Sequence, residues 1–203
     1  SSVYGRNPVL PKTEDLLCRP TSPYAVTKLA AEAYAAAYQA SFGVPVLPFR
    51  FFNIFGPLQA PGHAYAAVIP AFIHAALRGD PLVVHGNGQQ SRDFTYVDSV
   101  VDVLTRAVAG RVTSETPVNL AFGSRTSLNE LVDVLSETLG RPLPVRYAEP
   151  RIGDVPHSQA GPGLLRSLFP DVEPVPLHVG LRRTLSWMES EAEALGITQE
   201  ASA

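Results

Sequence analysis

The chain has 203 residues, 45% of them hydrophobic, which is enough to build one or two domains around a substantial core. Its net charge of −3 offers no basic surface for nucleic acid, and no apolar run reaches membrane-spanning length. We therefore expect an ordered cytoplasmic protein that binds neither nucleic acid nor a membrane. Cys18 has no cysteine or histidine nearby at a metal-ligand spacing, so no metal site is expected.

Helix and strand patterns alternate along the chain. Its first five residues have the character of a buried strand that ends in a loop. A long helix is predicted to begin after Ser22, with Pro23 at its first position, and to end before Gly43. Further helices are predicted at 66–78, 98–109, 127–139 and 177–195, strands at 44–52, 81–85, 92–97, 117–121 and 143–147, and a linker at 149–176. This order predicts an α/β fold.

One expected feature of a nucleotide-binding α/β fold is missing. A dinucleotide-binding domain begins with a strand, a glycine-rich turn and a helix. Gly86 and Gly88 have no third glycine at the required spacing, and Gly161 and Gly163 fit no better. The 203 residues therefore contain no dinucleotide fingerprint.

The most informative pair is Tyr24 and Lys28, four residues apart near the start of the first long helix. This spacing places the phenol and the ammonium on the same helical face, where the cation can favour a phenolate that acts as a base. Tyrosine and lysine four apart also occur on many solvated surface helices. The pair alone leaves both interpretations open.

Four more motifs follow this pair in order: Arg50-Phe51-Phe52-Asn53-Ile54-Phe55-Gly56-Pro57, Tyr65-Ala66-Ala67-Val68-Ile69-Pro70, Gln90-Ser91-Arg92-Asp93-Phe94 and Arg151-Ile152-Gly153-Asp154. Together the five motifs resemble the extended short-chain dehydrogenase/reductases, and among them the NAD-dependent nucleotide-sugar epimerases. The resemblance implies the C-terminal part of a Rossmann-like NAD-binding fold plus a smaller α/β substrate-binding region. Residues 1–60 would hold the end of the Rossmann domain with the catalytic helix. Residues 61–203 would be mainly substrate-binding, with Rossmann elements interleaved near 92–121, and the NAD-binding glycines would lie upstream of this chain.

The resemblance implies catalytic roles for Tyr24, Lys28 and Ser1. In the family, the tyrosine accepts the proton of the sugar 4-hydroxyl while hydride leaves C4 for the nicotinamide, and the lysine holds the nicotinamide ribose. Tyr24, Lys28 and Phe51 are thus the expected NAD contacts. The family's catalytic serine or threonine would fall one residue before Ser1, so Ser1 is expected to contact the sugar. Related dehydratases carry an acidic pair at positions 1 and 2, and the two serines found here favour epimerisation.

The resemblance also implies a binding set for a UDP-sugar. Arg92 corresponds to the arginine that holds the diphosphate. Ser158 corresponds to the residue that faces the sugar's 2-substituent, where a small side chain leaves room for an N-acetyl group. The other expected substrate contacts are Ser1, Asn53, Ala67, Val68, Val83, His85, Arg151 and Asp154.

The resemblance implies an isomerase, a NAD-dependent epimerase that acts on a UDP-hexose or UDP-N-acetylhexosamine by transient oxidation at C4. The parent enzyme is expected to be a homodimer, and this chain, without the glycine-rich turn, is expected to be inactive by itself. Two alternatives stay open: a non-catalytic module that binds a nucleotide sugar or a partner protein, and another reaction of the family, such as dehydration or decarboxylation. One departure from the family is Gly161, which replaces an aspartate that usually opens a helix.

Overall fold

The computed structural model describes residues 1–59, 67–150 and 155–194. The chain divides into two compact units, each made of three separate stretches. The first unit comprises Ser1–Ile54, Ser91–Arg125 and Val155–Pro174, and the second comprises Phe55–Gln90, Thr126–Asp154 and Val175–Ala203. The chain therefore passes from one unit to the other several times.

The long helix α1 (Pro23–Phe42) of the first unit forms as its sequence predicts. Its N-cap residue Ser22 accepts a hydrogen bond from the Ala25 amide through its side chain, and Pro23 occupies the first turn, where no amide donor is needed. At the other end, Gly43 adopts the left-handed conformation (φ 66°) and closes the last turn onto the Gln39 carbonyl. Local sequence alone sets both ends of this helix.

The centre of the first unit is a parallel pair of strands, β1 (Phe49–Phe51) and β6 (Val118–Leu120). The strand predicted at 44–52 is shorter than expected because Pro45 and Pro48 have no amide to donate. The strand predicted at 92–97 is divided into β4 (Ser91–Arg92) and β5 (Thr95–Tyr96).

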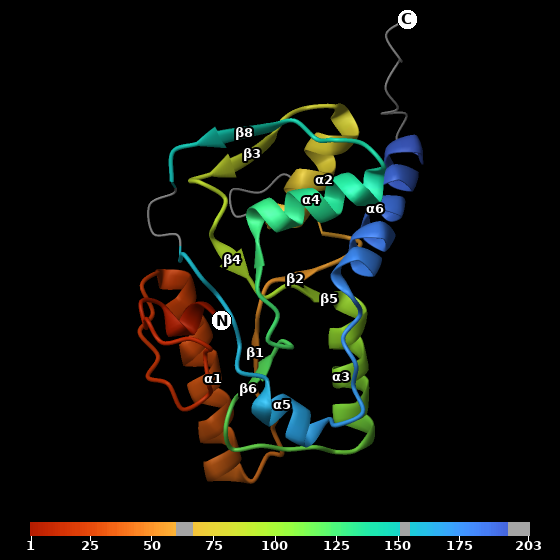
Figure 1. The fold of residues 1–203 in the computed structure, drawn as a ribbon. Coiled ribbons are helices and arrows are strands. Elements are labelled where there is room, and N and C mark those ends of the chain that lie inside the picture. Colours follow the sequence, from red (N-terminus) through yellow and green to blue (C-terminus); the bar gives the residue numbers. More distant parts are fainter. Residues whose placement is uncertain (60–66, 151–154, 195–203) are drawn as a thin grey trace, which may run out of the picture. The chain divides into compact units, whose positions relative to one another are not determined.

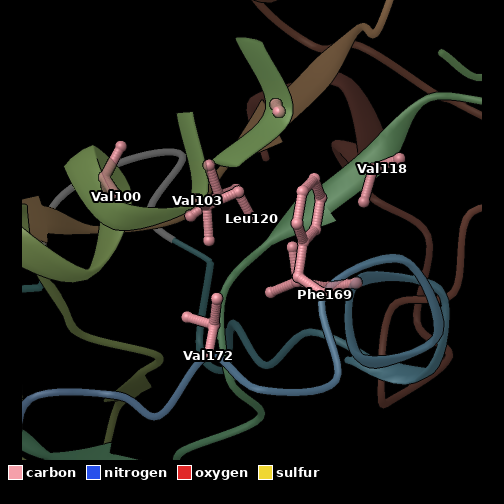
Figure 2. Packing of buried hydrophobic residues seen from close by; sticks show 8 residues of the cluster. Val100, Val103, Val118, Leu120, Phe169 and Val172 are labelled. Carbon is pink, nitrogen blue, oxygen red and sulfur yellow. The ribbon is translucent and has the colours of Figure 1, made fainter. Parts of the chain in front are cut away.

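One face of the β1–β6 pair is covered by α3 (Val97–Ala109) and α5 (Gly163–Leu168), and α1 lies on the other side (Figure 1). Figure 2 shows side chains from α3, β6 and the segment after α5 converging on one apolar cluster. Its buried members are Val100, Val103, Ala107, Val118, Leu120, Leu165, Phe169 and Val172. The prediction of a linker at 149–176 is therefore wrong. A six-residue helix is too short for hydrophobic periodicity to reveal it.

One other expectation, at the start of the chain, changes. Residues Ser2–Tyr4 form the short 3-10 helix η1 and not a strand end, and Val3 and Tyr4 are buried with Phe52, Ala121 and Ala160.

The presence of glycine at position 161 has a clear steric cause. A β-carbon there would lie 2.9 Å from the Thr13 methyl, and the Gly161 amide donates to the Lys12 carbonyl at 2.7 Å.

The second unit contains the parallel strands β3 (Leu82–His85) and β8 (Val145–Ala148) and the helices α2 (Val68–Arg78), α4 (Leu128–Leu139) and α6 (Leu177–Ala194). Helix α6 contacts α2 and α4, and α2 contacts β3. Ser127 and Glu130 form a capping box at the start of α4. In the sequence, the short strand β2 (Ile54–Phe55) contains the point at which the chain leaves the first unit, and β7 (Thr126–Ser127) begins the next stretch of the second unit.

Parallel strand pairs combined with helices confirm the predicted α/β class. Within the described ranges, no helix combines the length and apolarity required to cross a membrane. The same ranges hold no cluster of three side chains suited to binding a metal ion.

Candidate active site

Tyr24 and Lys28 lie on one exposed face at the beginning of α1. The Lys28 ammonium nitrogen is 5.2 Å from the centre of the Tyr24 ring, and Tyr24 is 63% exposed. The expected juxtaposition of phenol and ammonium is therefore present in the first unit. A phenol and an ammonium so exposed are both within reach of a bound molecule, where the phenol can exchange a proton with a hydroxyl.

Helix α1 buries very little of its own apolar surface. Of its described residues only Ala25 is fully buried, and Leu29 packs partly against the cluster around Tyr4. The apolar side chains Tyr34, Tyr38 and Phe42 are all more than half exposed. The position of the helix must therefore depend strongly on its polar contacts.

The main polar contact of α1 is a bidentate ion pair between Glu32 and Arg50 of β1. The Arg50 Nε and Nη2 atoms donate to the two Glu32 carboxylate oxygens at 2.8 and 2.7 Å. Arg50 is only 7% exposed. Burial opposes its charge, but its bonds to Glu32 and to the Tyr4 hydroxyl outweigh that effect and raise the pKa of the guanidinium.

This ion pair continues into a buried hydrogen-bond chain. Arg50 Nη1 donates to the Tyr4 hydroxyl at 2.8 Å, and that hydroxyl donates to Asn119 Oδ1 of β6 at 2.7 Å. Asn119 Nδ2 in turn donates to the Lys12 carbonyl at 2.8 Å. Burial raises the pKa of Tyr4, so the phenol stays protonated and can donate. The network links α1 to both central strands.

The sequence motifs do not predict this network. Two features of the sequence point toward it: Arg50 interrupts an apolar segment, and Glu32 lies one helical turn beyond Lys28. Its other members come from distant parts of the chain, and their proximity follows only from the fold.

Ser1 and Phe51 are brought together in the first unit. The Ser1 amino nitrogen donates to the Phe51 carbonyl at 2.6 Å, and the Phe51 ring, 44% exposed, stacks on Phe49 with 6.2 Å between ring centres. Asn53, two residues further on, donates from Nδ2 to the Asp93 carbonyl at 3.3 Å. Three predicted site residues therefore lie at the N-terminal segment and the end of β1.

Arg92 and Ser158 are joined through the backbone of Ser91. The Ser158 amide donates to the Ser91 carbonyl at 3.0 Å, and the Ser91 amide donates to the Pro156 carbonyl at 2.9 Å. Arg92 Nη1 donates to the Ser91 carbonyl at 2.9 Å. The structure thus places the expected diphosphate contact next to the expected sugar contact, both partly exposed.

The other predicted contacts belong to the second unit. Ala67 and Val68 form the start of α2, and Val83 and His85 alternate along β3 as its partly exposed residues. His85 Nδ1 lies 2.9 Å from the Glu149 carbonyl oxygen. Two further predicted residues, Arg151 and Asp154, lie outside the described residues.

Known proteins share this combination of sequence and fold. The sequence profile of the NAD dependent epimerase/dehydratase family matches residues 1–121. The chain belongs to this family. NAD is the family's cofactor, and the resemblance inferred from the five motifs is confirmed.

Among curated members of the epimerase/dehydratase family, the UDP-glucose 4-epimerase of Mycolicibacterium smegmatis is 31% identical over 192 residues, which cover 95% of this chain and 61% of that protein. A solved UDP-N-acetylglucosamine 4-epimerase from Methanobrevibacter ruminantium, in complex with UDP-N-acetylmuramic acid, is 35% identical with a TM-score of 0.88 and covers 94% of this chain and 61% of its own. TunA, a NAD-dependent NDP-hexosamine 5,6-dehydratase of tunicamycin biosynthesis, is 33% identical with a TM-score of 0.81. The match covers 93% of this chain and 60% of the TunA chain.

These relatives confirm the Rossmann-like class of the fold. The chain spans about 61% of the length of the relatives that it matches, and those relatives include both epimerases and a dehydratase. Family membership therefore leaves the individual reaction open.

Proposed function

We propose that the full-length protein containing this chain is a NAD-dependent UDP-sugar 4-epimerase. The observation that carries the proposal is the exposed Tyr24–Lys28 pair, with the Lys28 ammonium nitrogen 5.2 Å from the phenol ring. An exposed phenol beside an ammonium fits a site that must take a proton from a sugar hydroxyl and later return it.

In this proposal each residue has a separate task. Tyr24 accepts the proton of the 4-hydroxyl and gives it back after the sugar has presented its other face. Lys28 donates hydrogen bonds to the ribose hydroxyls of NAD, a role that suits an exposed ammonium. NAD, when bound, supplies reversible oxidation at the carbon that carries this hydroxyl. Phe51 lines the cofactor side and Ser1 contacts the sugar.

The substrate is held by the remaining residues. Arg92 binds the diphosphate, with a planar fork of donors that suits phosphate oxygens. Ser158 and Asn53 contact the sugar or its phosphate. Contacts to the uridine by Ala67, Val68, Val83 and His85 stay predictions, as do those by Arg151 and Asp154.

Ser1 and Ser2 support epimerisation over dehydration. Elimination of water needs an acid to protonate the departing hydroxyl, and a serine hydroxyl is a poor proton donor for that step. Epimerisation needs only one base that acts in both directions. The two serines therefore suit the reaction in which no carbon–oxygen bond is broken.

The test is to purify the full-length protein and incubate it with UDP-glucose and with UDP-N-acetylglucosamine. Chromatography and mass spectrometry of the products should reveal the C4 epimer at unchanged mass. A product that has lost water would replace this proposal with dehydration, another reaction of the family. Binding without turnover would favour the non-catalytic module. The 203-residue chain alone is expected to give no turnover.

We also propose that the full-length enzyme is a homodimer. Support comes from α1, whose side chains Tyr34, Tyr38 and Phe42 are 69%, 54% and 73% exposed. Exposed aromatic groups on one helix are suited to burial against another protein surface. Light scattering of the full-length protein after size-exclusion chromatography measures the mass, and a monomer at every concentration would contradict the proposal.

A further inference from the structure

Asp93 holds a fully buried carboxylate, and its four hydrogen-bond donors within the described part of the chain are all neutral. Its Oδ2 atom accepts hydrogen bonds from the Gly123 and Ala160 amides, both at 3.0 Å. Its Oδ1 atom accepts from the Ser124 amide at 3.1 Å and from the Ser124 hydroxyl at 2.8 Å. Asp93 therefore links three segments of the first unit that are distant in sequence.

Asp93 and Ser91 flank Arg92 in the sequence, and the side chains of both are buried. Their exposed fractions are 0% and 3%, and Arg92 between them is partly exposed. Successive side chains of an extended segment point to opposite sides. Fixing Ser91 and Asp93 inward therefore directs Arg92 outward.

The same two residues hold the segment that carries Ser158. The backbone of Ser91 bonds Pro156 and Ser158, and the Ser91 hydroxyl lies 2.9 Å from His157 Nδ1. Two residues further along both segments, the Asp93 carboxylate accepts from the Ala160 amide. Together these contacts fix the register of Ser158 against Arg92.

We propose that Asp93 is a positioning residue that sets Arg92 and Ser158 side by side for the nucleotide sugar. The proposal rests on the proposed function, which assigns the diphosphate to Arg92 and the sugar to Ser158. Asp93 itself touches no substrate. It also accepts the Asn53 amide through its carbonyl at 3.3 Å, so a third expected substrate residue depends on the same position.

The burial of the Asp93 carboxyl favours a role in positioning its neighbours over a role in stabilising the fold. Burial raises the pKa of the Asp93 carboxyl even though four hydrogen bonds act in the opposite direction. A buried ionised group of this kind contributes little to net stability, but it fixes the geometry of its donors. The hydrogen bonds to the Asp93 carboxylate come from the neutral donors of Gly123, Ser124 and Ala160.

The experiment replaces Asp93 by asparagine in the full-length protein and measures UDP binding by calorimetry and turnover by the epimerase assay. The amide keeps the size of the carboxylate but directs N–H donors at other N–H donors. We expect UDP affinity to fall and KM to rise by about 10- to 100-fold, because the loss of one hydrogen bond between Arg92 and the charged diphosphate has an effect of this size. The kcat should change by less than about threefold. Asp102→Asn is the matched control, since Asp102 is an exposed carboxylate on α3 that binds Arg106 at 2.8 Å.

Ser124→Ala is a second, milder variant. Ser124 is exposed, so its loss should not prevent folding, and it removes only the 2.8 Å bond to Asp93. UDP affinity should fall by about two- to fivefold, in line with one lost hydrogen bond, and the Ala160 amide should exchange its hydrogen faster.

The outcomes separate this inference from the proposed function. Unchanged UDP affinity in both variants, or a loss confined to kcat, would overturn the positioning role while the epimerase assignment stands. A wild-type protein that binds no UDP would overturn the proposed function and this inference with it. If Asp93→Asn does not fold, Ser124→Ala decides alone, and an unchanged affinity together with unchanged Ala160 exchange would contradict the inference.

Discussion

The Tyr24 hydroxyl can be removed without disturbing packing, because the side chain is 63% exposed. We expect Tyr24→Phe to lower kcat by about 100-fold or more, the usual effect of losing a general base. UDP affinity and thermal stability should stay at wild-type values. The measurements are steady-state kinetics and calorimetry on the full-length protein.

Tyr34→Phe is the control for this change, since Tyr34 lies on the same helix and is 69% exposed. It should leave kcat unchanged. Equal activity in Tyr24→Phe and Tyr34→Phe would remove Tyr24 from the mechanism.

A substitution at Ser158 tests which sugar the site accepts. A tyrosine there would fill the space expected for an N-acetyl group, and a pocket discriminates strongly by steric exclusion. We expect Ser158→Tyr to lower kcat/KM for UDP-N-acetylglucosamine by about tenfold or more relative to UDP-glucose. Ser167→Tyr, at an exposed site on α5, should leave the ratio unchanged. A ratio unaffected by Ser158→Tyr would remove this residue from the sugar site.

At the scale of the element, the placement of α1 depends on Glu32. Its partner Arg50 is 7% exposed and Glu32 is 17% exposed, so breaking the pair leaves a buried charge with a weaker partner. We expect Glu32→Gln to lower the free energy of unfolding by about 3 kcal/mol, at the lower end of measured losses for buried ion pairs. Chemical denaturation measures this loss.

The exposed pair of Asp102 and Arg106 provides the comparison, with side chains 43% and 46% exposed. Asp102→Asn should cost less than about 1 kcal/mol because solvent screens such a pair. If Glu32→Gln costs no more than Asp102→Asn, Leu29 packing and not the ion pair holds the helix.

The elements also show which features a sequence can predict. The bounds of α1 follow from Ser22, Pro23 and Gly43, and the meeting of Tyr24 with Lys28 follows from helical spacing, because these are local effects. Non-local structure was less predictable. The helix α5 was missed because its stability comes from burying Leu165 in a cluster built from other segments. The Arg50 network was missed for the same reason, since its partners Tyr4 and Asn119 are 115 residues apart.

At the scale of the whole molecule, the buried Asp93 carboxylate should make stability depend on pH. Burial raises its pKa above the ordinary value of 3.8, so the folded protein holds this proton more tightly than the unfolded chain. Unfolding then releases a proton, and the contribution of Asp93 to the free energy of unfolding falls as pH rises from that ordinary value through the raised one. The sign is opposite to that of a salt-bridged surface carboxylate.

The contribution of this single group can be isolated by comparing wild-type protein with Asp93→Asn, because all other titrating groups are common to both. Urea denaturation at several pH values between about 3.5 and 7 gives the free energy of unfolding of both proteins. We expect the difference between them, wild type minus Asp93→Asn, to become smaller toward neutral pH. Asp102→Asn, at a solvated carboxylate, should not reproduce this trend. An advantage that grows with pH would mean that the four hydrogen bonds outweigh burial, and Asp93 would then be a net source of stability at neutral pH.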